Sequence, residues 1–149
     1  QKILSSKKIG NNIIYTINFN SDIASDVCQF VLTEKETTFY VQTWIDDFQP
    51  LKDLTEMAIL FGSILTKEKQ AGDVDILLVF EKENFLKVQE HINKINHIKS
   101  KNIHAIVQTK DDLFSNIKKR DPAILEEIRA GLILWGRDIL VEGIKYGKD

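Results

Sequence analysis

Residues 60–80 read LFGSILTKEKQAGDVDILLVF, in which a polar and basic segment joins two apolar runs. The first run, residues 57–61, predicts a short buried strand, and the pair Gly62-Ser63 closes it. After nine further residues a second run begins at Asp73 and predicts another strand. The stretch therefore predicts one strand that ends in Gly-Ser and a second strand that begins with Asp-Val-Asp.

The second strand, residues 73–80, is apolar on both faces beyond Asp75, as expected for a central strand in a helix-covered sheet. Because side chains alternate along a strand, Asp73 and Asp75 point to one face, with Cα atoms roughly 6 to 7 Å apart. Two carboxylates this close repel each other, and a divalent cation removes the conflict. Mg²⁺ commonly binds one or two carboxylates together with phosphate oxygens, so the pattern indicates phosphoryl or nucleotidyl transfer.

The spacing of these motifs resembles the signature of the DNA polymerase β-type nucleotidyltransferase superfamily, in particular its minimal nucleotidyltransferase proteins. The signature consists here of FGS, nine intervening residues, and DVD followed by ILLVF. The resemblance covers residues 54–109, and the tail EEIRAGLILWGRDIL is also similar to the end of such domains. It implies that Gly62 and Ser63 grip the triphosphate of a nucleotide, while Asp73 and Asp75 hold Mg²⁺. Glycine lets backbone amides approach a phosphate and serine adds a short donor, which supports this assignment.

The polar segment between the two motifs contains three further candidate nucleotide-binding residues, which are Lys67, Lys69 and Gly72. One or both lysines are expected to assist on the phosphates of the nucleotide. We expect the nucleotide to bind in a Mg²⁺-dependent manner.

One position departs from the superfamily pattern, which usually carries a third carboxylate on the strand after the central helix. The matching residues 103–106 read IHAI, so that His104 stands in its place. The resemblance implies that this carboxylate ligands the catalytic metal or accepts the proton of the attacking hydroxyl. A neutral imidazole can accept a proton, but Mg²⁺ prefers oxygen ligands. His104 is therefore either a catalytic residue or a histidine without a role at the mouth of the cleft.

The remaining periodicity predicts an α/β (α+β) fold, in which helices flank a mixed sheet. Residues 81–100 have apolar side chains at steps of three and four and predict a helix, and residues 102–109 predict the next strand. Two short helices are expected around residues 113–117 and 124–128, followed by a strand at residues 132–135 and a closing helix. The helix in 81–100 is expected to pack through five side chains: Phe85, Val88, Ile92, Ile95 and Ile98.

The N-terminal part predicts a β-hairpin and a helical section. The turn sequence GNN at residues 10–12 and the alternation over residues 13–19 predict the hairpin. Beyond residue 20 apolar side chains at helical spacing predict a helix, and residues 40–48 form a second stripe, as a second helix or a bent continuation. The first helix is expected to pack through Ile23, Val27 and Val31.

We therefore expect three parts: a hairpin over residues 1–19, a linking helical section over 20–50 and a nucleotidyltransferase-like domain over 51–149. The hairpin resembles the wing of a winged helix-turn-helix domain, because a basic turn precedes a YTIN strand. An ordinary hairpin is the alternative. The helix-turn-helix itself would lie upstream, and a chain that begins with Gln instead of Met is expected to be a fragment or a processed form.

Composition narrows the setting. The chain has 149 residues, 43% of them hydrophobic, and a formal net charge of −2, which gives no electrostatic footprint for nucleic acid or membrane. No apolar stretch approaches the roughly 18 to 20 residues needed to span a bilayer. The single cysteine, Cys28, excludes an internal disulfide and suits a reducing compartment. We expect a cytoplasmic protein that does not bind membranes.

Two function classes follow from these features. The first is an enzyme that moves a nucleoside monophosphate from a nucleoside triphosphate to a hydroxyl on a protein or a nucleic acid. The second is a catalytically degenerate domain that senses nucleotide, or forms a homodimer, in a winged-helix regulator. The Gly-Ser and Asp-x-Asp motifs favour the first, whereas His104 and the wing-like start favour the second. DNA is an expected partner only if an upstream winged helix exists.

Overall fold

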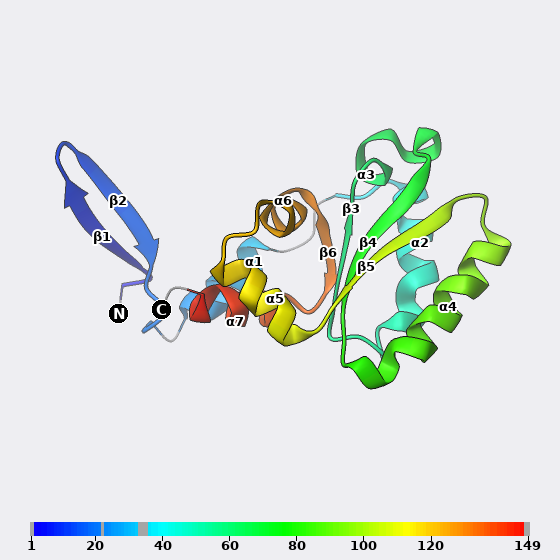
Figure 1. The fold of residues 1–149 in the computed structure, drawn as a ribbon. Helices are drawn as coiled ribbons and strands as arrows, with labels where there is room; N and C mark the ends of the chain where they lie inside the picture. The colour runs from blue at the N-terminus through cyan, green and yellow to red at the C-terminus, as the bar shows by residue number, and fades with distance from the viewer. Residues whose placement is uncertain (1, 22, 33–35, 148–149) are drawn as a thin grey trace. The chain divides into compact units, whose positions relative to one another are not determined.

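The computed structural model describes residues 2–21, 23–32 and 36–147. The chain divides into two compact units, Gln1–Thr33 and Glu34–Asp149, each with its own secondary structure (Figure 1). In the described part of the chain, no helix combines the length and the apolar character that crossing a bilayer requires.

The first unit contains the hairpin and one helix. Strand β1 (Leu4–Ile9) pairs antiparallel with β2 (Asn12–Ile17), and Gly10 has a φ of 58° in the turn between them. Helix α1 (Ala24–Val31) follows. The predicted hairpin and helix are confirmed, but the predicted packing of the helix is wrong. The three side chains expected to pack are exposed by between 36% and 75%: Ile23, Val27 and Val31.

The second unit is built on one four-stranded sheet. Its strands are β3 (Met57–Phe61), β4 (Asp73–Val79), β5 (Asn102–Gln108) and β6 (Leu132–Trp135). The order is β5-β4-β3-β6, in which β4 and β5 are parallel and β3 is antiparallel to both of its neighbours. The predicted mixed sheet is therefore confirmed.

Among the described residues, five longer helices and one short helix accompany the sheet. They are α2 (Phe39–Phe48), α4 (Phe85–Ile98), α5 (Lys110–Lys118), α6 (Pro122–Ala130), α7 (Arg137–Tyr146) and the single-turn α3 (Ile64–Lys67). Short 3₁₀ turns lie at Gln49–Leu51, Glu68–Gln70 and Lys82–Asn84. In Figure 1, α2 and α4 lie on one side of the sheet, and α5, α6 and α7 lie on the other.

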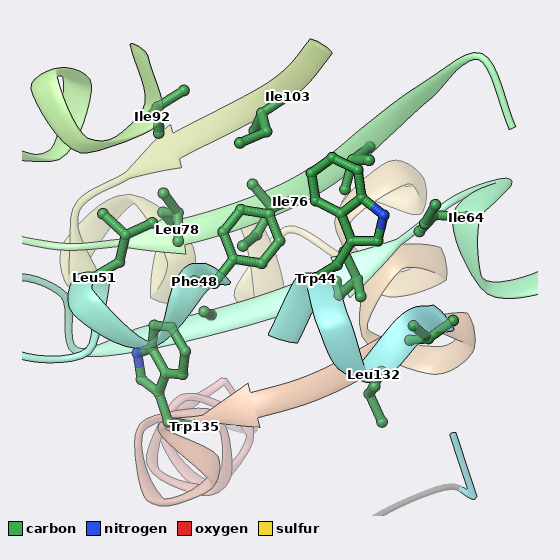
Figure 2. Packing of buried hydrophobic residues seen from close by; sticks show 14 of the residues in the cluster. Trp44, Phe48, Leu51, Ile64, Ile76, Leu78, Ile92, Ile103, Leu132 and Trp135 are labelled. Carbon is green, nitrogen blue, oxygen red and sulfur yellow. The ribbon is translucent and has the colours of Figure 1, made fainter. Parts of the chain in front are cut away.

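The main core lies between the sheet and the pair α2 and α4 (Figure 2). Trp44 and Phe48 of α2 are 2% and 0% exposed, and they pack against alternate strand residues such as Ile76 and Leu78. Helix α4 contributes two fully packed residues, Val88 and Ile92. The expected burial along α4 does not extend to its ends, because Phe85 is 45% and Ile98 is 82% exposed.

Helix α6 packs on the opposite face of the sheet and leads directly into β6. Asp121 caps its start by accepting hydrogen bonds from the backbone N–H groups of Ala123 and Ile124, both at 3.0 Å. At its end, a Cβ added to Gly131 would overlap the side chain of Ile59 and the carbonyl oxygen of Glu127. The end of α6 is therefore fixed closely against β3.

Candidate nucleotide site

The Gly62-Ser63 turn leaves β3 directly beside the side chain of Asp75. Gly62 has a φ of 78°, a conformation that residues with a side chain rarely adopt. The strand register places Asp75 opposite Phe61, the residue before Gly62, and a Cβ on Gly62 would overlap Oδ2 of Asp75. Position 62 therefore requires glycine for its backbone conformation and for the space that the carboxylate occupies.

Asp73 and Asp75 begin β4 and lie on the same face of the strand. Val74 between them is fully buried in the core with α2 and α4, so both carboxylates point to the other face. The Asp75 side chain is 20% exposed, whereas Asp73 is an exposed residue. The strand thus presents one carboxylate held against the Gly62 turn and a second one open to solvent.

His104 stands beside Asp75 on the parallel neighbouring strand. The β4–β5 register pairs the two residues, and Nδ1 of His104 lies 3.1 Å from Oδ1 of Asp75. Because an ionised carboxylate only accepts hydrogen bonds, the ring donates through Nδ1–H. The His104 side chain is 69% exposed, so the rest of the ring faces solvent. The structure therefore places His104 beside Asp75, at the position where the resemblance implies a third acid.

The segment between the two motifs forms α3 and a 3₁₀ turn. Its predicted nucleotide-binding residues Lys67, Lys69 and Gly72 are all exposed. A Cβ added to Gly72 would meet no atom within 4 Å, and the φ of this glycine is not positive. Neither the backbone conformation nor the space at position 72 requires a glycine, in contrast to position 62.

Glu127 on α6 is an acidic residue near the site that the sequence analysis did not single out. Its Oε2 atom is buried and has no hydrogen-bond partner within the described structure. Burial raises the pKa of the Glu127 carboxyl, and the negative charges of Asp121 and Asp75 raise it further. No local pattern marks this residue, because only the packing of α6 against β3 brings it towards Asp75.

A pocket of about 380 Å³ lies at the other end of β4 and β5. It is lined mainly by apolar groups, including Phe80, Phe85 and Val107, together with Thr109 and Asp112 at the start of α5. Asp112 and Thr109 are engaged with each other in a capping box. This pocket is therefore distinct from the carboxylate site at the beginning of the two strands.

The chain belongs to the nucleotidyltransferase domain family, whose family model matches residues 45–130. The matched range includes β3, β4 and β5 and every candidate site residue named above. None of the curated proteins compared with the chain matches it. The fold and the family together define a nucleotidyltransferase-like domain.

Domains of this family generally use divalent metal ions. The carboxylate oxygens of Asp73 and Asp75 are ligands of the type that Mg²⁺ prefers, and they lie on one face. Across the described residues, however, no three or more His, Cys, Asp or Glu side chains are grouped to hold a metal ion by themselves. The residues thus fit a cation whose coordination is completed by other oxygens, such as those of a nucleotide.

Proposed function

We propose that this domain binds a nucleoside triphosphate together with Mg²⁺ and transfers a nucleoside monophosphate to a hydroxyl acceptor. The observation that carries this proposal is the contact between the two motifs. The Gly62 turn lies against the carboxylate of Asp75, and Asp73 lies on the same face. A phosphate-binding turn beside a cation-binding pair is the arrangement that nucleotidyl transfer requires.

The chain's own residues have separate tasks in this proposal. The turn at Gly62 lets the backbone come close to the triphosphate, and the Ser63 hydroxyl is available as a donor because it does not cap α3. Asp73 and Asp75 hold the cation, which would neutralise phosphate charge and polarise the phosphoryl group under attack. Lys67 and Lys69 add positive charge on the exposed segment between the motifs.

His104 is the candidate proton acceptor. Its Nδ1–H donates to Asp75, which orients the ring and leaves Nε2 as the acceptor nitrogen of the neutral imidazole. A hydroxyl that attacks the α-phosphate must lose its proton, and a positioned base contributes typically 10² to 10⁴ in rate. The acceptor hydroxyl in this proposal belongs to a protein side chain or a nucleic acid. We propose the cytoplasm as the compartment in which the protein acts.

A second candidate function is a nucleotide-sensing or dimerising domain of a winged-helix regulator. The observation that favours it is again His104, because an imidazole is a poor Mg²⁺ ligand at a position where the superfamily usually has a carboxylate. In this version the β1–β2 hairpin is the wing, and DNA contacts need further elements upstream. The hairpin lies outside the matched range 45–130.

The carboxylates provide the direct test of nucleotide binding. Titration of the wild-type protein with a nucleoside triphosphate should show binding that strengthens at least tenfold when Mg²⁺ is added. The variant Asp73→Asn/Asp75→Asn should lose this Mg²⁺ dependence, because amides do not replace the two anionic ligands. Asp53→Asn is the matched control, since Asp53 is an exposed carboxylate outside both motifs. Equal Mg²⁺-dependent affinity in the double variant would show that the carboxylates are not the metal site.

A further inference from the structure

Lys101 connects the turn before β5 to the segment that separates Ser63 from Asp73. Its Nζ donates a hydrogen bond of 2.9 Å to the carbonyl oxygen of Lys69 and another to the carbonyl oxygen of Ala71. A charged donor makes such bonds stronger than those between neutral groups. One side chain thus holds two carbonyl groups that lie 30 or more positions away in the sequence.

The bridged segment has little packing of its own. Between Thr66 and Asp73, a stretch that the structure describes completely, Ala71 is the one buried residue. Glu68 has a φ of 47°, which is unfavourable for a residue with a side chain. A strained and exposed segment keeps one conformation only when surrounding contacts determine it. The two hydrogen bonds from Lys101 are contacts of this kind.

The strand pairing fixes where Lys101 stands. Asn102, the next residue, is paired with Asp73 in the parallel β4–β5 ladder. The turn itself is held because the Asn96 side-chain oxygen accepts a hydrogen bond of 2.8 Å from the backbone N–H of Ile103. The ammonium group of Lys101 is therefore supported from a part of the fold that is independent of the bridged segment.

We infer that Lys101 is a positioning residue that holds the segment between the Gly-Ser turn and the Asp-Val-Asp strand in its nucleotide-binding conformation. This inference rests on the proposed function. The ammonium group acts through the backbone of Lys69 and Ala71, which sets the direction of Lys69 and the start of β4 at Asp73. In this way Lys101 fixes the conformation of the segment that would bind the triphosphate, before the nucleotide binds.

Three full-length variants test this inference. Lys101→Met removes the charge and the hydrogen-bond donors but keeps a side chain of similar length. Lys101→Arg keeps the charge and the donors. Lys87→Met is the control, because it changes an exposed lysine on α4. We call the two hydrogen bonds from Lys101 to the segment the clamp. Amide hydrogen exchange of residues 68–73 without nucleotide measures how strongly the clamp holds this segment. Nucleoside triphosphate binding, and the separation of KM from kcat where turnover is observed, measure its consequence. Circular dichroism checks that each variant is folded.

Lys101→Met should accelerate exchange in the segment about tenfold and weaken nucleotide binding or raise KM by a similar factor, with little change in kcat. Lys101→Arg should recover both properties at least in part, and Lys87→Met should match the wild type. Unchanged exchange in Lys101→Met would overturn the inference. Weaker nucleotide binding without faster exchange would also overturn it, because Lys101 would then contact the phosphate directly.

Failure of the proposed function gives a different result. If the wild-type protein binds no nucleotide, hydrogen exchange still decides whether Lys101 clamps the segment, while the role of that clamp in nucleotide binding is refuted. If exchange accelerates in Lys101→Met but nucleotide affinity is unchanged, the clamp exists and does not position the site.

Discussion

His104 is the residue at which the two proposed functions separate. Its hydrogen bond to Asp75 suits both a base that is oriented for proton transfer and a remnant of a site that has lost a carboxylate. Only a change at this position distinguishes the two, because Gly62, Ser63, Asp73 and Asp75 are common to both.

For an enzyme that uses His104 as its base, His104→Ala should lower turnover by roughly 10² to 10⁴. For an enzyme weakened by a missing carboxylate, His104→Asp should raise turnover, because it supplies a third oxygen ligand beside Asp75. Pyrophosphate release from radiolabelled ATP with candidate acceptors measures both variants against the wild type. No turnover in any of the three proteins, despite measurable nucleotide binding, would instead support the sensor.

Glu127 provides a prediction about stability. Its folded-state pKa is raised above the ordinary 4.5, so the folded protein binds this proton more tightly than the unfolded chain. The protein therefore loses stability as the pH rises from about the pKa of Glu127 in the unfolded chain through its raised pKa in the folded protein. Glu127→Gln should stabilise the protein at pH 7 by less than about 1 kcal/mol, because water screens a carboxyl that is only partly buried.

The stabilising effect of Glu127→Gln should shrink as the pH falls through 4.5, because the Glu127 carboxyl then becomes protonated in the unfolded chain as well as in the folded protein. Thermal unfolding at pH 4, 5.5 and 7 measures it. Glu126→Gln is the control, because the hydrogen-bonded ion pair with Arg129 lowers the pKa of the Glu126 carboxyl and gives the opposite sign. A Glu127→Gln variant that is less stable than the wild type at pH 7 would show that the carboxylate has a favourable partner.

At the scale of elements, the order of the strands and of the longer helices was predictable from the sequence, whereas the single-turn α3 in the polar segment between the motifs was not. The strands of the sheet are short and mainly apolar, and the longer helices have apolar residues at helical spacing. The packing partners of the helices were not predictable. Phe85 and Ile98 continue the apolar pattern of α4 but lie beyond the part of the helix that the sheet covers. Pattern alone cannot show where a neighbouring element ends.

The same distinction applies to the site. Gly62, Ser63, Asp73 and Asp75 lie within one local stretch, and their motif could be recognised directly. Lys101 and Glu127 come to the site from the α4–β5 turn and from α6. Their contacts depend on how distant elements pack, so no spacing in the sequence identifies them.

The junction of α6 with β3 can be tested through Gly131. Gly131→Ala should destabilise the protein by about 1 to 3 kcal/mol, because its Cβ would overlap Ile59 and the backbone of the preceding helix. Gly72→Ala is the matched control, since open space surrounds that position. Urea unfolding compares the two variants. Equal stability of both would mean that α6 shifts easily on the sheet.

At the scale of the whole molecule, the main core is contained in the second unit. Every residue of the principal hydrophobic cluster lies between Val41 and Trp135. We expect residues 36–149 alone to fold, with a Tm within about 5 °C of the full chain, and to keep its nucleotide affinity. Circular dichroism melting and a nucleotide titration of both forms measure this. A shortened chain that does not unfold cooperatively would show that the first unit contributes to the stability of the second.

The space that Gly62 leaves for the Asp75 carboxylate has a consequence for evolution. Position 62 lies in the turn after β3, and position 75 lies on the adjacent strand β4. Their side chains would share one volume, so a larger residue at position 62 is compatible only with a smaller one at position 75. Substitutions at sites in such contact are not additive. A lineage that abandons nucleotide chemistry and loses the aspartate removes one of the two constraints on the glycine, and only the turn conformation then preserves it. Covariation of these two positions among descendants would therefore record whether the chemistry was retained.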